Sequence, residues 1–247
     1  MTVSDQHIPL LELRGDARAR GAAYGEHFRR RLADTWSFYA GSVFTTSKLS
    51  TTEIERRAEQ VRQAIGTFKA DYCDEIDAMA AAAGLPRWTV YALNARTEIL
   101  NATVGECTAL FLPDTRTLGQ TWDWLEALED LVVLAHHRYP DGHRILSFAE
   151  PGQLGKIGLN SAGLGVCLNF LVAPHGFEGL PVHVLVRALL ECRSLDEARA
   201  LLGRVGLGKA SHFLIGSADG RAISYEFAGT RVGEAEAVDG VYAHTNH

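Results

Sequence analysis

The chain has 247 residues, of which 47% are hydrophobic and 22% are charged, and its formal net charge is −6. This composition is typical of a globular protein with a sizeable core, and it provides no basic field that would attract nucleic acid or an anionic membrane. The sequence has no apolar run of about 18 residues and no N-terminal export pattern, so we expect a cytoplasmic protein without a membrane span.

The first hundred residues are predicted to be helical. In residues 18–39, apolar side chains recur at helical spacing through Phe28, Leu32 and Trp36, which predicts a helix there. A further helix is expected over Trp88–Leu100.

The strongest helix signal lies between these two segments. Ser50 followed by Glu53 is a capping-box pattern, in which each residue satisfies a backbone N–H of the first helical turn. One apolar stripe then continues from Ile54 to Met79 at steps of three or four. The glycine and proline of residues 84–86 are expected to end this helix.

From Cys107 onward the pattern changes to short segments rich in β-branched and aromatic residues. Turn glycines, prolines and aspartates separate them, which is typical of an antiparallel sheet. The expected strands lie within "CTALFLP", "LGQTWDW", "LVVLAHHRY", "RILSFAE", "GKIGLN" and "GLGVCLNFLV".

Two helices are predicted to interrupt the strands. One covers about Pro181–Cys192, and the other begins at Ser194, where Glu197 completes a second capping box. Strands return in a hairpin that turns at Asp219-Gly220 and in the final "GVYAHTNH". Helices, strands, a helical pair and strands again predict an α+β fold of sheets covered by helices, rather than alternating βαβ units.

Metal and phosphate sites find little support in the sequence. There is no phosphate-binding glycine loop, and "GLNSAGLG" is better explained as a turn. The adjacent His136 and His137 would point to opposite faces of a strand, while His244 and His247 have no carboxylate or cysteine near them in sequence. We therefore expect no metal and no cofactor.

The cysteines form no CxxC pair, so neither a zinc ribbon nor a disulfide framework is indicated. Each could simply be a small buried hydrophobic residue. The four are Cys73, Cys107, Cys167 and Cys192.

Cys107 differs from the other three because it stands where helices give way to strands. If the peptide bond before it were cut, its own α-amine, with a pKa near 7.7–8.0, could activate the thiol. Such a site needs a group that orients the amine and amides that stabilise an oxyanion. Asp123, Asn169 and Asn246 are polar residues in strand-like segments and could supply these groups.

At this point the sequence resembles a known family. "GECTALFLP", "GQTWDW", "KIGLNSAGLGVCLNFL", "VHVLVRALLECRSLDEARALL", "SHFLIGSADG" and "HTNH" are similar, in order and spacing, to segments of the acyl-coenzyme A:6-aminopenicillanic acid acyltransferase family. These are N-terminal-nucleophile (Ntn) hydrolases, more distantly related to penicillin V acylase and bile salt hydrolase. The similarity extends from about Leu11 to the end of the chain.

The resemblance implies a four-layer αββα sandwich and a precursor that cleaves itself between Glu106 and Cys107. It implies a helical small chain (1–106) and a β-rich catalytic part (107–247) that stay associated in one compact unit, and it leaves a homo-oligomer open. By the family pattern, Asp123 would orient the α-amine, while the Asn246 side chain and the backbone at Asn169 would stabilise the oxyanion. Asn160 matches a structural asparagine.

The substrate implied by the resemblance is a small-molecule amide or acyl thioester, with acyl-coenzyme A possible as acyl donor. Cys107 would form an acyl-enzyme, which water or an amine would resolve. The sequence therefore leaves transferase and hydrolase open, and it identifies neither the acyl group nor the acceptor.

The sequence departs from the family pattern in two respects. Family members often have glycine before the nucleophile, whereas Glu106 stands here, and a bulkier residue could slow self-cleavage. They also usually continue beyond the "HTNH" strand, with further sheet and an active-site arginine, so a truncated C-terminus is one interpretation.

Structural alternatives exist for each candidate residue. Asp123 could cap a strand end, Asn169 and Asn246 could be turn or edge residues, and Arg96 and Glu98 are expected to form a structural ion pair. For the whole chain, the alternative to an enzyme is an inactive Ntn-fold domain that serves binding or assembly.

Overall fold

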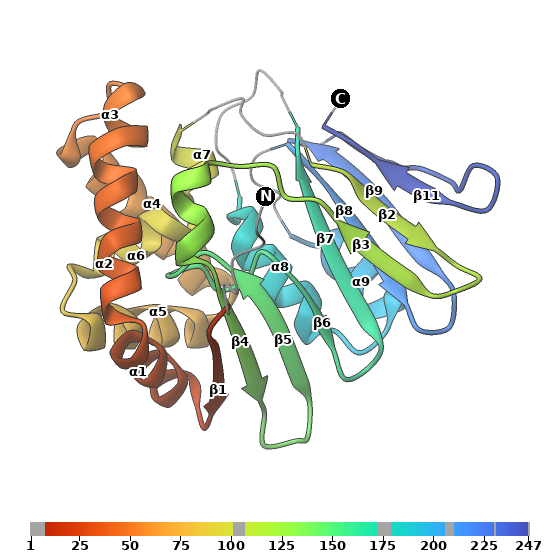
Figure 1. The fold of residues 1–247 in the computed structure, drawn as a ribbon, viewed down its shortest axis with the longest axis horizontal. Helices are drawn as coiled ribbons and strands as arrows, with labels where there is room; N and C mark the ends of the chain where they lie inside the picture. The colour runs from red at the N-terminus through yellow and green to blue at the C-terminus, as the bar shows by residue number, and fades with distance from the viewer. Residues whose placement is uncertain (1–7, 101–106, 172–178, 206–209, 230, 247) are drawn as a thin grey trace, which may run out of the picture.

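The structure is a computed structural model that describes residues 8–100, 107–171, 179–205, 210–229 and 231–246 (Figure 1). It confirms a mixed α/β architecture, in which the N-terminal helices gather at one end of a large sheet (Figure 1). The helices of this N-terminal group are α1 (Ala17–His27), α2 (Arg29–Phe38), the π-helical turn η1 (Tyr39–Val43), α3 (Phe44–Thr46), α4 (Thr51–Phe68), α5 (Ala70–Ala83), α6 (Arg87–Asn94) and α7 (Arg96–Leu100).

The strands form two sheets. The large sheet has the order β1-β4-β5-β6-β7-β8-β9-β10, and the small sheet has the order β11-β2-β3. All neighbouring strands are antiparallel except β1 and β4. The strand bounds are β1 (Leu10–Arg14), β2 (Ala109–Leu112), β3 (Thr117–Gln120), β4 (Val133–Arg138), β5 (Arg144–Ala149), β6 (Ile157–Asn160), β7 (Leu164–Phe170), β8 (Ser211–Ser217), β9 (Ala222–Ala228), β10 (Arg231–Glu234) and β11 (Tyr242–His244).

The small sheet and helix α8 (Val182–Glu191) cover opposite faces of the large sheet. A Cβ at Gly158 would meet Leu190 of α8, whereas one at Gly165 would meet Leu118 of β3. Gly165 pairs with Leu159, the residue after Gly158, and successive side chains along a strand alternate between faces. A helix layer, the large sheet and the small sheet are thus stacked in that order, while the full four-layer sandwich stays a prediction.

Both predicted capping boxes have their N-cap bond. The Ser50 hydroxyl accepts a hydrogen bond from the Glu53 N–H at 3.2 Å, and Ser194 accepts one from Glu197 at 3.1 Å at the start of α9 (Leu195–Leu202). The hairpin turn at Asp219-Gly220 is also confirmed, between β8 and β9, with Gly220 at φ +88°.

Some sequence-based expectations about the N-terminal half were wrong. The stripe from Ile54 to Met79 lies on two helices, because Lys69 adopts an extended conformation (φ −158°, ψ 106°) between α4 and α5. The segment expected as one helix over Trp88–Leu100 is divided at Ala95 into α6 and α7. The first hundred residues also contain a strand, β1, whose alternating side chains gave only a short signal.

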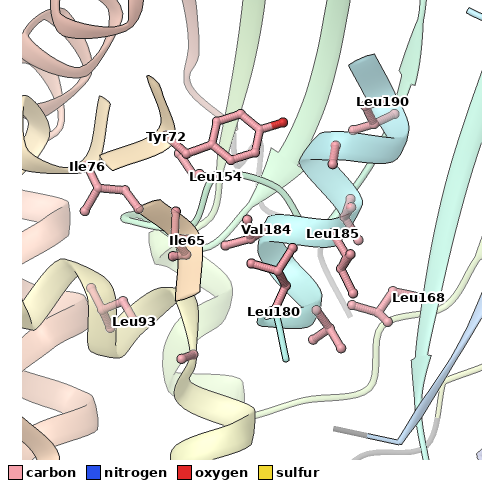
Figure 2. Close-up of a cluster of buried hydrophobic side chains, with 14 of the residues drawn as sticks. Ile65, Tyr72, Ile76, Leu93, Leu154, Leu168, Leu180, Val184, Leu185 and Leu190 are labelled. Atoms are coloured by element: carbon pink, nitrogen blue, oxygen red, sulfur yellow. The ribbon is translucent and has the colours of Figure 1, made fainter. Parts of the chain in front are cut away.

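The main hydrophobic core lies between the N-terminal helices and α8. Figure 2 shows side chains from α4, α5 and α6 facing those of α8 and the strand β7. This arrangement joins the part of the chain before Cys107 to the part after it through shared apolar contacts. The labelled members are Ile65, Tyr72, Ile76, Leu93, Leu154, Leu168, Leu180, Val184, Leu185 and Leu190.

Candidate active site

Cys107 lies two residues before the start of β2, the central strand of the small sheet, and it is buried. Two side-chain amides hold its backbone. The Cys107 N–H donates a short hydrogen bond to Asn246 Oδ1, and its carbonyl oxygen accepts one from Asn169 Nδ2 at 2.7 Å. Cys107 is therefore held on both sides by residues that lie 62 and 139 positions further along the chain.

Asn169 reaches Cys107 from the neighbouring large sheet. It lies in β7 and is fully buried, and its Oδ1 is 3.2 Å from Nδ1 of His212, the directly paired residue of β8. Because Asn169 Oδ1 can only accept, His212 Nδ1 must carry the proton. His212 Nε2, 2.9 Å from the Ser224 hydroxyl, then accepts from Ser224.

His212 is held in this neutral tautomer by its surroundings. Burial, together with the neighbouring His244, lowers the pKa of His212 to about 3. The His244 ring stacks on it at 3.6 Å between centroids. Sequence reasoning missed His212, although a histidine in the apolar strand "SHFLIGS" was a usable signal, since a buried polar side chain requires a partner.

Asn246 connects the two sheets at the same point. It follows β11, and its Nδ2 donates to the Phe170 carbonyl oxygen at 2.6 Å while Oδ1 accepts from Cys107. The bond to Phe170 ties this residue to the end of β7, next to Asn169. The structure therefore brings Cys107, Asn169 and Asn246 into direct contact.

Asp123 lies close to this group but is joined to it indirectly. Its Oδ2 accepts from the Thr121 hydroxyl at 3.3 Å, and Thr121 Oγ1 accepts from the Thr108 N–H at 3.1 Å. Asp123 is exposed and follows the end of β3, so the expectation of a strand through "GQTWDW" was wrong for its last four residues. Glu106, the predicted residue before the cleavage site, lies outside the described residues.

A buried ionic cluster lies beside the site. Arg96 forms a bidentate pair with Glu150, at 2.5 and 3.1 Å, and Tyr39 donates to the same carboxylate at 2.6 Å. Burial, opposed by the Arg96 charge, raises the pKa of Tyr39 well above its usual value. Glu98, which the sequence analysis paired with Arg96, accepts the Val182 N–H at the start of α8, and its charge also acts on Arg96.

Asn160 and the remaining cysteines have structural surroundings. The Asn160 amide donates to the carbonyl oxygens of Leu190 and Cys192, so it holds the end of α8. Burial raises the pKa of Cys167 to about 12 and that of Cys192 to about 11, which makes both poor nucleophiles at neutral pH.

Within the described parts of the chain, no group of three or more histidine, cysteine, aspartate or glutamate side chains is arranged to hold a metal ion. Among the same residues, no helix has the length and apolar character needed to cross a membrane.

Comparison with known proteins supports the family resemblance. The family described as acyl-coenzyme A:6-aminopenicillanic acid acyl-transferase matches residues 111–247. The chain is also 28% identical over 236 residues to the 40 kDa form of acyl-coenzyme A:6-aminopenicillanic-acid-acyltransferase from Emericella nidulans. This similarity covers 92% of the chain and 66% of the relative, so the chain spans slightly less than two thirds of that protein.

Proposed function

Because the chain belongs to the acyl-coenzyme A:6-aminopenicillanic acid acyltransferase family, we propose that it is a self-processing cysteine acyltransferase or amidohydrolase. Its substrate in this proposal is a small amide or acyl thioester, with acyl-coenzyme A as one possible donor. The observation that carries the proposal is the double amide contact at Cys107, from Asn169 and Asn246.

Self-cleavage would begin with an acyl shift. The Cys107 thiol attacks the carbonyl carbon of Glu106, the thiol proton passes to the departing Cys107 nitrogen, and the peptide bond becomes a thioester. Water then cleaves the thioester, which releases the Glu106 carboxyl group and restores the thiol. Asn246 Oδ1 supports this step because it already holds the nitrogen that becomes the α-amine.

The processed enzyme would use that amine as its base. An α-amine titrates near 7.7–8.0, so it can take the thiol proton while Sγ attacks the substrate carbonyl. The leaving group departs with that proton, and water or an acceptor amine resolves the acyl-enzyme. Asp123 would orient the amine through the Thr121 and Thr108 contacts.

The oxyanion would be held by the Asn246 side chain and the backbone at Asn169. Asn246 Nδ2 carries two hydrogens, of which the contact with Phe170 uses one. The second hydrogen remains as a donor for the developing charge. Preorganised donors of this kind contribute most when water is excluded, and Cys107 is buried.

Intact-mass analysis of the purified protein tests the proposal directly. We expect two fragments that divide between Glu106 and Cys107, and a single uncut chain for Cys107→Ala. The matched control is Cys167→Ala, which removes a buried thiol in β7 and should leave processing intact. Processed protein should also label at Cys107 with a thiol-directed acyl analogue.

An uncut wild-type chain that never takes the label would overturn the proposal. It would instead favour the inactive binding or assembly domain that the sequence left as an alternative.

A further inference from the structure

Lys156 is buried next to the candidate site without a counter-ion in contact. The residue is 1% exposed. Among the described residues, the contacts of its ammonium are with aromatic rings rather than with a hydrogen-bond acceptor or a carboxylate. Nζ lies 4.4 Å from the Trp122 ring centroid and 5.5 Å from that of Phe170. A buried ammonium that lacks hydrogen-bond acceptors is costly, and such groups are retained mainly where a ligand or a reaction uses them.

The neighbours of Lys156 belong to the segments that build the site. Trp122 precedes Asp123, and Phe170 follows Asn169 and accepts the hydrogen bond from Asn246. Cys107 is also among the groups whose charge acts on Lys156, which places the ammonium within electrostatic range of the thiol.

Trp122 has a second unused donor at the same place. Its Nε1 is buried, and within the described part of the chain it has no hydrogen-bond partner. An indole N–H can only donate, and so can an ammonium group. Two adjacent groups that can only donate, both buried, fit a ligand that can only accept.

The loop that carries Lys156 is held rigidly. Residues 150–156, between β5 and β6, are all buried. The Asn94 side chain donates to the Gly152 carbonyl oxygen at 2.6 Å and accepts from the Leu154 N–H at 2.9 Å. A preorganised cation binds an anion with little loss of conformational entropy.

We infer that Lys156 and the Trp122 indole N–H form a subsite for a carboxylate group of the substrate, next to Cys107. This inference rests on the proposed function, because it assigns the chemical class of the molecule that Cys107 attacks. A carboxylate supplies the acceptors that both donors lack, and the two aromatic rings would shield the ion pair from water.

Protonation provides a second line of argument. Burial, together with the Arg96 guanidinium, lowers the pKa of Lys156 to about 7. At pH 8, Lys156 is therefore a neutral amine in most molecules that have no ligand bound. The charges of Glu150 and Cys107 raise the pKa of Lys156. Lys156 in turn contributes to the lowered pKa of His183, which lies within electrostatic range. A bound carboxylate restores the charge, so binding at pH 8 should take up close to one proton.

Calorimetry tests the subsite without requiring turnover. We would titrate 4-phenylbutanoate and the neutral 4-phenylbutan-1-ol into the purified protein, in whichever state of processing the mass measurement finds. The carboxylate should bind more tightly than the alcohol. Lys156→Met should reduce the ratio of the carboxylate affinity to the alcohol affinity by about 10- to 100-fold, as expected for loss of a charged hydrogen bond. Trp122→Phe keeps the ring and should reduce the ratio by a smaller factor.

The controls separate binding from folding. Lys48→Met removes an exposed lysine and should leave the ratio unchanged, while Lys156→Arg, which keeps a cation, should preserve most of it. Titration of wild type in buffers of different ionisation enthalpy should show proton uptake for the carboxylate only. An unchanged ratio in Lys156→Met, or equal affinity of wild type for both probes, would overturn the inference even if self-cleavage is observed.

Turnover of two amide substrates then shows on which side of the scissile bond the carboxylate binds. N-hexanoylglycine carries it on the amine side of the scissile bond, and the mono-methylamide of hexanedioic acid carries it on the acyl side. A preference for either acid over its methyl ester supports the subsite and locates it, whereas equal rates for acids and esters contradict it.

Discussion

Single polar side chains hold the backbone of Cys107 in place, and His212 does so indirectly. It does not contact Cys107, but its Nδ1–H orients the Asn169 amide so that Nδ2 points to the Cys107 carbonyl oxygen. His212 is therefore a positioning residue. Its neutral state follows from its low pKa, which lies well below the pH range in which the protein would be assayed.

Two substitutions at His212 separate its two hydrogen bonds. His212→Asn keeps a donor near the position of Nδ1, whereas His212→Gln keeps a polar group near Nε2, which faces Ser224. We expect the first variant to self-process at close to the wild-type rate and the second to be slower by about 10-fold, the value of one hydrogen bond. The time course of fragment appearance measures this.

The control for both variants is their thermal stability. If His212 acted only on stability, the rate of processing would follow the melting temperature of each variant. Equal processing rates in His212→Asn and His212→Gln, at different melting temperatures, would contradict a positioning role. Between pH 5 and 8 we expect no inflection from His212, because its pKa of about 3 lies below that range.

The carboxylate subsite has a consequence for stability. In the folded protein the pKa of Lys156 is lowered to about 7, mainly by burial, while an unfolded lysine titrates near 10.4. The unfolded state therefore binds more protons between these values, and the stability cost of Lys156 decreases as pH rises from about 7 to about 10. Below pH 7 the full cost is present.

Lys156→Met should accordingly be more stable than wild type at pH 7, and this advantage should shrink toward pH 10. Urea unfolding at several pH values, compared as the difference between the two proteins, cancels the other titrating groups. Lys48→Met serves as the matched control and should show no such trend. A Lys156→Met variant that is less stable at pH 7 would indicate that the lysine stabilises the fold.

At the level of elements, the closest contact is the crossing of α1 and α5. A Cβ at Gly21 would lie 2.0 Å from the Glu75 carbonyl oxygen, and one at Gly25 would lie 2.2 Å from that of Met79. Two glycines one turn apart therefore let the two helix backbones touch. Real Cβ atoms do not approach a backbone oxygen this closely, so the helices would have to separate.

Gly21→Ala and Gly25→Ala should each lower the free energy of unfolding by about 3 kcal/mol, at the upper end of what overpacking costs. Gly66→Ala in α4 is the matched control, since its Cβ would lie 3.5 Å from the Cys73 sulfur. There alanine should be neutral or stabilise by up to about 1 kcal/mol, through its higher helix propensity. Chemical unfolding measures all three, and equal effects at Gly21 and Gly66 would contradict the crossing.

The elements also show what a sequence can predict. The Ser50 and Ser194 caps and the turn at Gly220 were predictable because each depends on a few adjacent residues. The break at Lys69 was not, since the apolar stripe continues across it. Strand β1 was missed because its pairing partner, β4, lies more than one hundred residues further along the chain.

The same distinction applies to the site. Cys107 was singled out because helices give way to strands there, and Asn169 and Asn246 because a polar residue in a strand requires a partner. The Arg96–Glu150 pair was missed because two charges 54 residues apart share no local pattern. The burial of Lys156 and the unpartnered Trp122 indole N–H emerge only when burial and contacts are known.

At the scale of the whole molecule, the segments before and after Cys107 are joined by much more than one peptide bond. Strand β1 pairs with β4 in the large sheet, and Glu75 of α5 accepts hydrogen bonds from Arg187 of α8 at 3.0 Å. Arg20 of α1 donates to the same carboxylate at 2.8 Å. All three of these charged side chains are buried.

These contacts predict that the fragments 1–106 and 107–247 stay together after cleavage. Native size-exclusion chromatography should give one peak containing both fragments, and they should separate only in concentrated guanidinium chloride. Arg187 is the link that we would remove, because among the described residues its loss leaves Arg20 alone paired with the buried Glu75. Breaking a buried pair in this way costs about 3–5 kcal/mol.

Arg187→Met should therefore release the small chain at lower denaturant concentration than wild type. Arg221→Met, which removes a cation paired with Asp219 on the exposed β8–β9 turn, is the matched control and should leave the midpoint unchanged. Two separate peaks from the processed wild type under native conditions would contradict the prediction. The core that α8 shares with α4, α5 and α6 would then be too weak to hold the chains together without the covalent link (Figure 2).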